Sequence, residues 1–193
     1  MFRKEIRVQI RNRRRELSPQ FQLQASKNIV SLIKKDFPSV FSRGTFAIYL
    51  TNDGELDTSA LIKHLWKLGK KVCLPVIGED GSRRMTFREY LPDSRMEENR
   101  YGIQEPAAEN CEIPLEQIDV VFTPLVAFDA NGNRLGMGGG FYDCTLREKA
   151  PRTMVIGLAH DLQQVDTLPA EAWDVPLPCI ATPSRIFHFK QQI

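Results

Sequence analysis

The segment that decides the fold runs from Val120 to Lys149 and reads VVFTPLVAFDANGNRLGMGGGFYDCTLREK. Its first ten residues, up to Asp129, form an apolar run typical of a buried strand that leads into a loop. Four glycines then fall within the five positions 136–140, and the residues from Tyr142 onward predict a helix. Glycine lets backbone N–H groups approach an anion closely, and the start of a helix is electropositive. This order of strand, glycine loop and helix indicates a site that holds phosphate.

The glycine loop matches neither of two common nucleotide-binding fingerprints. A P-loop ends in Gly-Lys-Ser or Gly-Lys-Thr, whereas this loop ends in Gly-Phe-Tyr-Asp. The spacing G-x-G-G-G also differs from the G-x-G-x-x-G of dinucleotide-binding folds. A plain glycine-rich turn is the alternative interpretation. Arg134 and Asp143, which flank the glycines, favour a nucleotide site in which Asp143 holds a metal ion on the phosphates.

The rest of the sequence alternates between helical and strand patterns. Helices are expected over 1–17, 19–36 and 58–68, since Ser18 and Pro19 are typical of a helix start and Gly69 of a helix end. Strands are expected over 45–51, 71–76, 85–90, 118–122, 154–158 and 186–189, with an irregular connection over 91–115. The alternation predicts an α/β fold: a single three-layer α/β/α domain of residues 1–193 with a largely parallel sheet.

The composition is that of an ordinary globular protein, with 42% hydrophobic and 26% charged residues. No apolar run approaches the roughly 20 residues that span a membrane, and the N-terminus lacks the apolar segment of a secretory signal. We therefore expect a cytoplasmic protein with no membrane partner. Cys73, Cys111, Cys144 and Cys179 show no C-x-x-C spacing, which argues against a zinc site or a redox pair. Cys144 lies beside the glycine loop, without a nearby histidine in the sequence to activate it.

Positive charge is concentrated at the N-terminus. The first 15 residues hold seven basic side chains and one acidic one, which leaves 19 basic against 23 acidic residues in the rest of the chain. Phe2, Ile6 and Ile10 recur on one helical face, and arginines line the adjacent face. Three interpretations are open: a solvated surface, a surface that binds nucleic acid, and a clamp on a nucleotide held by the same chain. In the third, Arg3 and Arg7 pair with phosphate from positions one turn apart.

Several blocks of the sequence resemble one known family. The pattern Arg-Leu-Gly-x-Gly-x-Gly-(Tyr/Phe)-Tyr-Asp, preceded by Ala-Phe-Asp-x-x-Gly, is similar to the signature of 5-formyltetrahydrofolate cyclo-ligase, also called methenyltetrahydrofolate synthetase. Further blocks of resemblance lie at 49–58, 71–75, 101–106, 157–159 and 168–169. The resemblance implies an ATP- and Mg²⁺-dependent enzyme of one-carbon metabolism that converts 5-formyltetrahydrofolate to 5,10-methenyltetrahydrofolate, with release of ADP and phosphate. A protein without catalytic activity that binds RNA or a nucleotide through its basic helix is the alternative.

The resemblance also implies which residues bind ATP. These are the basic residues near the N-terminus and the glycine loop with its flanks: Arg3, Lys4, Arg7, Arg134, Leu135, Gly136, Met137, Gly138, Gly139, Gly140, Phe141 and Tyr142. The family usually has Lys where this chain has Arg3, and Lys4 is a possible substitute. Some relatives carry Lys where Gly139 stands. Arg134 and Tyr142 are expected to position the reacting groups, and Arg11 to Arg15 are expected to be only surface residues.

Folate and metal roles follow from the same resemblance. The residues expected to contact the folate are Leu50, Glu55, Met137 and Phe141. A carboxylate suits a pterin because it accepts two hydrogen bonds from adjacent ring N–H groups, and an aromatic face can stack on the ring. Asp143 and Asp174 are expected to hold Mg²⁺. The family's usual His and Asp near Asp174 are replaced here by Trp173 and Pro178, which makes Asp174 the weaker candidate.

The sequence indicates no pair of nucleophile and base. The three histidines have no metal-ligand spacing to one another and are interpreted as structural or surface residues: His64, His160 and His188. The expected catalysis therefore consists of positioning the substrates and stabilising charge.

Overall fold

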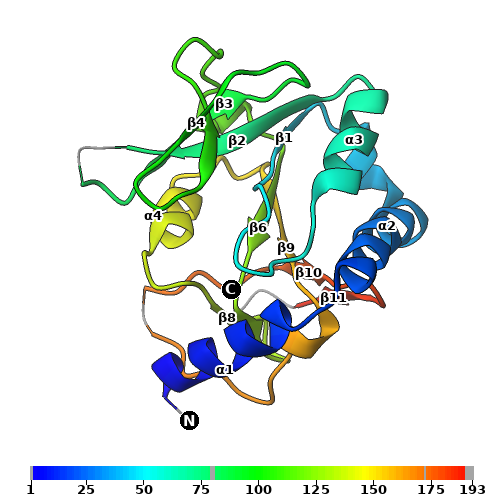
Figure 1. The fold of residues 1–193 in the computed structure, drawn as a ribbon, viewed down its shortest axis with the longest axis vertical. Coiled ribbons are helices and arrows are strands. Elements are labelled where there is room, and N and C mark those ends of the chain that lie inside the picture. Colours follow the sequence, from blue (N-terminus) through cyan, green and yellow to red (C-terminus); the bar gives the residue numbers. More distant parts are fainter. Residues whose placement is uncertain (1, 79–80, 172, 190–193) are drawn as a thin grey trace.

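The computed structural model describes residues 2–78, 81–171 and 173–189. Its centre is a seven-stranded sheet with the strand order β11-β10-β9-β6-β1-β2-β3 (Figure 1). The five inner strands run parallel: β10 (Cys179–Ala181), β9 (Met154–Leu158), β6 (Val120–Pro124), β1 (Thr45–Ala47) and β2 (Lys71–Ile77). The two edge strands pair antiparallel: β11 (Ile186–His188) and β3 (Met85–Glu89). The predicted α/β class with a largely parallel sheet is confirmed.

Helices cover both faces of this sheet. On one face lie α2 (Pro19–Asp36) and α3 (Ser59–Lys67), and on the other lies α4 (Phe141–Arg147) (Figure 1). Successive side chains of a strand point to opposite faces. Val120 and Phe122 therefore pack with α2 and α3, whereas Val121 packs with Leu146 of α4. The predicted three-layer arrangement is confirmed.

Helix α1 (Arg3–Arg15) packs on neither face of the sheet. Its apolar residues Ile6 and Ile10 are buried against the hairpin of β7 (Ala127–Phe128) and β8 (Arg134–Leu135). Phe2, expected on the same buried face, precedes the helix as its N-cap and is 79% exposed. The helix thus lies beside the carboxyl end of β6 and brings its arginines to that edge of the sheet.

The structure differs from the sequence-based prediction in several connections. Pairing of the first strand ends at Ala47, and the extended residues beyond it lead into a turn over 52–55. The segment 91–115 contains a two-stranded sheet of β4 (Met96–Glu98) and β5 (Gln104–Pro106). Strand β10 was not predicted, because it is only three residues long and follows a segment rich in proline. Short 3-10 helices lie in other connections: η1 (Pro38–Ser42), η2 (Leu115–Gln117) and η3 (Asp161–Gln163).

The connection from β6 to the glycine loop is also less direct than predicted. The hairpin of β7 and β8 intervenes, and its turn is closed by the buried carboxylate of Asp129, which accepts hydrogen bonds from the backbone N–H groups of Asn131 and Asn133. The glycine loop therefore follows a strand of this hairpin and not a strand of the central sheet. None of the described helices is long and apolar enough to cross a bilayer.

Candidate functional site

A cleft of about 850 Å³ opens at the carboxyl ends of β1, β2 and β6, which is where α/β folds place their ligands. It brings together most of the predicted site residues: Arg3, Arg7, Leu50, Glu55, Arg134, Gly136, Met137, Gly138, Gly139, Gly140, Phe141, Tyr142, Asp143 and Asp174. Two predicted residues do not line it. Lys4 is exposed on α1, and Leu135 is buried against Ile6 and Ile10.

The glycine loop has a backbone that favours glycine at two positions. Gly138 has a φ of 108°, and Gly140, the N-cap of α4, has a φ of 73°. Residues that carry a side chain rarely adopt such φ values. Arg7 contacts the same loop: its Nε–H donates to the carbonyl oxygen of Gly136 at 2.8 Å. Burial and the neighbouring charge of Arg3 lower the pKa of Arg7. The glycine loop and the guanidinium group of Arg7 thus lie together in one wall of the cleft.

A buried ion pair lies behind this wall. Arg134 is 4% exposed, and its Nη2 donates to Oδ1 of Asp143 at 2.6 Å. Its Nε–H has no hydrogen-bond partner among the described residues, and burial lowers the pKa of the guanidinium. A buried N–H group without a partner is costly. Because Arg134 also lines the cleft, an anion bound there would offset that cost.

Asp143 and Asp174 differ in how far their oxygens are already engaged. Both hydrogen bonds that Asp143 accepts from described residues, from Arg134 and from the backbone N–H of Val175, use Oδ1. Asp174 accepts from Arg3 through both oxygens. Burial raises the pKa of Asp174, but the bonds from Arg3 and from the backbone of Glu171 outweigh it and lower the pKa overall.

These contacts bear on which carboxylate can hold a metal ion. The described residues contain no cluster of three or more His, Cys, Asp or Glu side chains that could hold one. A Mg²⁺ ion carried by a nucleotide needs only one or two carboxylates, since phosphate oxygens and water complete its shell. Asp143 fits that requirement through its second oxygen, whereas Asp174 would have to share its oxygens with Arg3.

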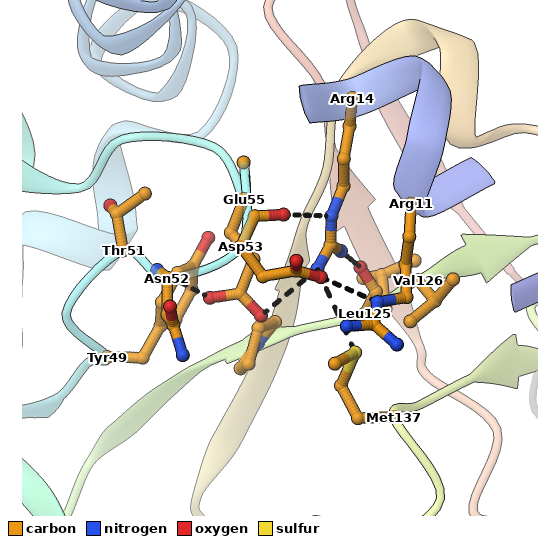
Figure 2. A network of polar contacts seen from close by, with 12 residues as sticks. Arg11, Arg14, Tyr49, Thr51, Asn52, Asp53, Glu55, Leu125, Val126 and Met137 are labelled. Atoms are coloured by element: carbon orange, nitrogen blue, oxygen red, sulfur yellow. Dashed lines mark hydrogen bonds and ion pairs between the residues drawn. The ribbon is translucent and has the colours of Figure 1, made fainter. Parts of the chain in front are cut away.

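Not all of the arginines at the end of α1 are the surface residues that the sequence predicted. Arg11 and Arg14 both pair with the carboxylate of Asp53, and Arg14 is fully buried (Figure 2). Arg15 pairs with the same carboxylate but is exposed. The prediction failed because their partner, Asp53, lies in the turn after β1, far from α1 in the sequence. Arg13, which points elsewhere, is exposed as predicted.

Glu55 is a carboxylate that is largely buried. Its side chain is 12% exposed, and burial raises its pKa from 4.5 to about 7, although the charge of Arg14 partly opposes the shift. Its Oε2 accepts the backbone N–H of Asn52 at 3.2 Å, and its Oε1 lies 4.0 Å from Nη2 of Arg14. A carboxylate of this kind changes protonation near neutral pH and lacks a strong partner of its own, which suits recognition of a ligand that brings N–H donors.

Aromatic side chains line the cleft on the side of the glycine loop. Phe141 and Tyr142 both reach it, and the ring of Phe141 meets Tyr101 edge-on at 6.0 Å between centroids. Burial raises the pKa of Tyr142 well above 10, so its hydroxyl stays neutral. No histidine is among the described residues that line the cleft, which leaves Cys144, also in the lining, without an activating base.

The lining residues that the sequence-based assignment of the site missed include Arg83, Arg147 and Trp173. Arg83, in the connection from β2 to β3, approaches Gly140 so closely that a Cβ there would lie 3.5 Å from its Cδ. Arg147 donates to the carbonyl oxygen of Trp173. No sequence pattern marks these residues, because only the fold brings them to the glycine loop.

Comparison with known proteins agrees with this geometry. Residues 2–183 match the model of the 5-formyltetrahydrofolate cyclo-ligase family. Over 182 residues the chain is 44% identical to the 5-formyltetrahydrofolate cyclo-ligase of Escherichia coli, covering 93% of this chain and all of the relative. The cyclo-ligase of Haemophilus influenzae is 43% identical, covering 91% of this chain and 94% of the relative.

Solved structures give the same result. The 5,10-methenyltetrahydrofolate synthetase of Aquifex aeolicus superposes with a TM-score of 0.85 at 27% identity, covering all of this chain and 95% of the other. The synthetase of Mycoplasma pneumoniae superposes with a TM-score of 0.76 at 25% identity, covering 95% and 99% of the two chains. Sequence and fold agree over nearly the whole length, and this chain belongs to the 5-formyltetrahydrofolate cyclo-ligase family.

Proposed function

We propose that this protein is a ligase that uses ATP and Mg²⁺ to convert 5-formyltetrahydrofolate to 5,10-methenyltetrahydrofolate, ADP and phosphate. Beside the family membership, one observation supports the proposal: a single cleft is lined both by the glycine loop with Arg3, Arg7 and Arg134 and by Glu55 with aromatic side chains. The proposed enzyme is a single-domain cytoplasmic protein whose partners are its small-molecule substrates.

The nucleotide half of the cleft is the wall of the glycine loop. Its backbone, with Arg3, Arg7 and Arg134, supplies positive charge from several directions, and the free Nε–H of Arg134 gives one further donor. Triphosphate oxygens would accept these hydrogen bonds, which are stronger than neutral ones because they are charge-assisted. Arg83 would add a cation beside Gly140. Some relatives carry a lysine at the preceding position, where this chain has Gly139.

The folate half lies around Glu55 and the aromatic residues. The carboxylate of Glu55 would accept hydrogen bonds from adjacent pterin N–H groups, and Leu50, Met137 and Phe141 would cover the ring. The charges of Glu55 and Arg134 both act on Tyr142, so we place the formyl group of a bound folate and the terminal phosphate of the nucleotide beside this residue.

The reaction would proceed in two bond-forming steps. The formyl oxygen attacks the terminal phosphorus, and the bond between that phosphorus and ADP breaks. N10 then attacks the activated formyl carbon, the carbon–oxygen bond breaks with release of phosphate, and the departing phosphate accepts the N10 proton. The arginines neutralise charge on the transferred group, and the aromatic walls exclude water. No general base is required of the protein, since its work is to align the reactants.

The metal ion is assigned to Asp143, with Asp174 as a second or indirect partner. A bound Mg²⁺ would neutralise phosphate charge. The chain's own part is to present the second carboxylate oxygen of Asp143 beside the loop, while Arg134 holds the first.

The alternative of RNA binding through the basic helix has less support. Arg3, Arg11 and Arg14 pair with carboxylates of the same chain, so they are not displayed for a phosphate backbone. The decisive experiment is to incubate purified protein with 5-formyltetrahydrofolate and to follow the methenyl product by its absorbance, with and without ATP and Mg²⁺. Product formation only with both supports the proposal. Its absence, together with RNA binding that weakens steeply with salt, would favour the alternative.

A further inference from the structure

The turn that carries Glu55 has a strained backbone. Asp53 is the one non-glycine residue with a positive φ in the described part of the chain, at 52°, and Gly54 follows with 72°. A Cβ on Gly54 would lie 2.9 Å from the carbonyl oxygen of Arg14. The turn is therefore pressed against the backbone of α1. A positive φ is strained at a residue with a side chain, such as Asp53, and persists only where the surroundings fix it.

An ion cluster fixes this turn to α1. The carboxylate of Asp53 accepts from Nε of Arg11 at 2.7 Å, from Nη2 of Arg14 at 2.7 Å and from Nε of Arg15 at 2.5 Å. Burial raises the pKa of Asp53, but these three bonds outweigh it and hold the pKa at about 2. Asp53 is thus ionised throughout the neutral range.

Arg14 is the member of this cluster that reaches the site. It is fully buried, and its Nε–H donates to the backbone carbonyl oxygen of Asp53 at 2.7 Å while its Nη2 pairs with the carboxylate (Figure 2). The same Nη2 lies 4.0 Å from Oε1 of Glu55. One guanidinium therefore holds the turn by two of its atoms and stands beside the carboxylate that the turn presents.

We infer that Arg14 is a positioning residue for the substrate, which fixes the turn through Asp53 and so sets where the Glu55 carboxylate meets the folate. The inference rests on the proposed function, in which Glu55 binds the pterin. It adds a role for residues that have no other contact with the reaction, and it accounts for the full burial of an arginine at the end of a basic helix.

The charges around Glu55 give this inference a specific signature. The charge of Arg14 lowers the pKa of Glu55 and that of Asp53 raises it. Tyr49 and Tyr142 also face Glu55, and burial keeps both phenols neutral by raising each pKa above 10. His160 lies near the backbone of the turn and is neutral around pH 7, because burial lowers its pKa to about 4. Removal of Arg14 should therefore shift the titration of Glu55 upward, and neutralisation of Asp53 should shift it downward.

The test is the pH dependence of 5-formyltetrahydrofolate affinity between pH 6 and 9. In Arg14→Met, folate affinity at pH 7 should fall at least tenfold. It should recover in part at alkaline pH, because Glu55 then ionises at a higher pH than in the wild type. In Arg14→Lys the charge remains and the two-point contact is lost, so affinity should fall with a smaller shift of the profile. In Asp53→Asn the profile should shift to lower pH. Arg13→Met is the matched control on the same helix, and it should bind folate as the wild type does.

The outcomes separate this inference from the proposed function. If a folded Arg14→Met variant keeps the wild-type affinity and pH profile while Glu55→Gln loses folate binding, the inference is wrong and the folate site stands. Weaker binding with an unshifted profile in both Arg14→Met and Asp53→Asn would also overturn it, since that is what general structural damage produces. If Glu55→Gln itself binds folate normally, the proposed folate site is wrong. Should Arg14→Met not fold, the loss of folate affinity in Arg14→Lys, which keeps the charge and removes the two-point contact, decides the matter.

Discussion

Arg7 and Gly136 join helix α1 to the glycine loop: the Nε–H of Arg7 donates to the carbonyl oxygen of Gly136 at 2.8 Å. The guanidinium then lies alongside Gly138, where a Cβ would be 3.7 Å from its Cζ. A helix from the start of the chain thus forms part of the wall proposed to bind phosphate.

The first prediction concerns Arg7→Ala. This variant should need at least tenfold more ATP for half-maximal turnover, because a lost charge-assisted hydrogen bond costs about 1.5–3 kcal/mol. Arg13→Ala is the control, since Arg13 is exposed on the same helix and does not line the cleft. ATP titrations of both variants check the prediction. Equal changes in the two would indicate a general electrostatic field in place of a specific contact.

The second prediction concerns Gly138→Ala, which places a side chain at a φ of 108°. The expected result is weaker ATP binding, because the loop must change its backbone to relieve the strain. Gly69→Ala is a matched control: Gly69 also has a positive φ, 66°, and nothing lies within 4 Å of its missing Cβ. Both variants should lose stability, and only Gly138→Ala should lose ATP affinity in calorimetric titrations. Unchanged ATP affinity in Gly138→Ala would remove the loop from the nucleotide site.

The sequence was most informative where function depends on local pattern. The glycines between Arg134 and Asp143, and the helix start at Ser18 and Pro19, depend on neighbours in the chain, so both the fold class and the cleft-lining residues of the loop could be predicted. The burial of Arg14 could not, because its partner Asp53 lies 39 residues away and the pair forms only when α1 packs beside the turn. Arg83 escaped notice for the same reason. Charge runs look alike in sequence whether they face solvent or a buried carboxylate.

The third prediction concerns Asp143→Asn. The amide keeps the shape and can still accept a hydrogen bond from Arg134, but it is a poor ligand for Mg²⁺. The concentration of Mg²⁺ needed for half-maximal turnover should rise sharply, and that for Asp174→Asn should rise less, since Arg3 already engages both oxygens of Asp174. Mg²⁺ titrations at saturating ATP measure both. A wild-type Mg²⁺ requirement in Asp143→Asn would leave Asp143 with only its structural bond to Arg134.

The fourth prediction concerns His160, a fully buried histidine. Burial lowers its pKa from 6.5 to about 4. As pH falls, the unfolded chain therefore binds the proton before the folded protein does. The free energy of unfolding falls by about 3 kcal/mol in total between pH 6.5 and 4 because of His160. His160→Leu should remove that loss. The measurement is the difference in unfolding free energy between pH 7.5 and pH 5, in which any packing cost of leucine that does not depend on pH cancels. An unchanged difference would contradict a neutral buried His160.

The fifth prediction concerns Glu55, whose contribution to stability has the opposite sign. Its pKa in the folded protein is raised from 4.5 to about 7, so the folded protein holds a proton that the unfolded chain releases. Stability therefore falls as pH rises from 4.5 to 7, by about 3 kcal/mol in total. In the wild type this loss and the gain in stability that His160 gives as pH rises offset each other across nearly the same range.

Glu55→Gln should thus be more stable than the wild type at pH 7.5 and little changed near pH 4.5, although it binds folate poorly. Urea denaturation of Glu55→Gln and His160→Leu should show stability rising with pH in the first and falling with pH in the second. Parallel slopes in the two variants would mean that Glu55 is already ionised well below pH 7, and its assignment as a carboxylate held ready for the pterin would then lose its electrostatic basis.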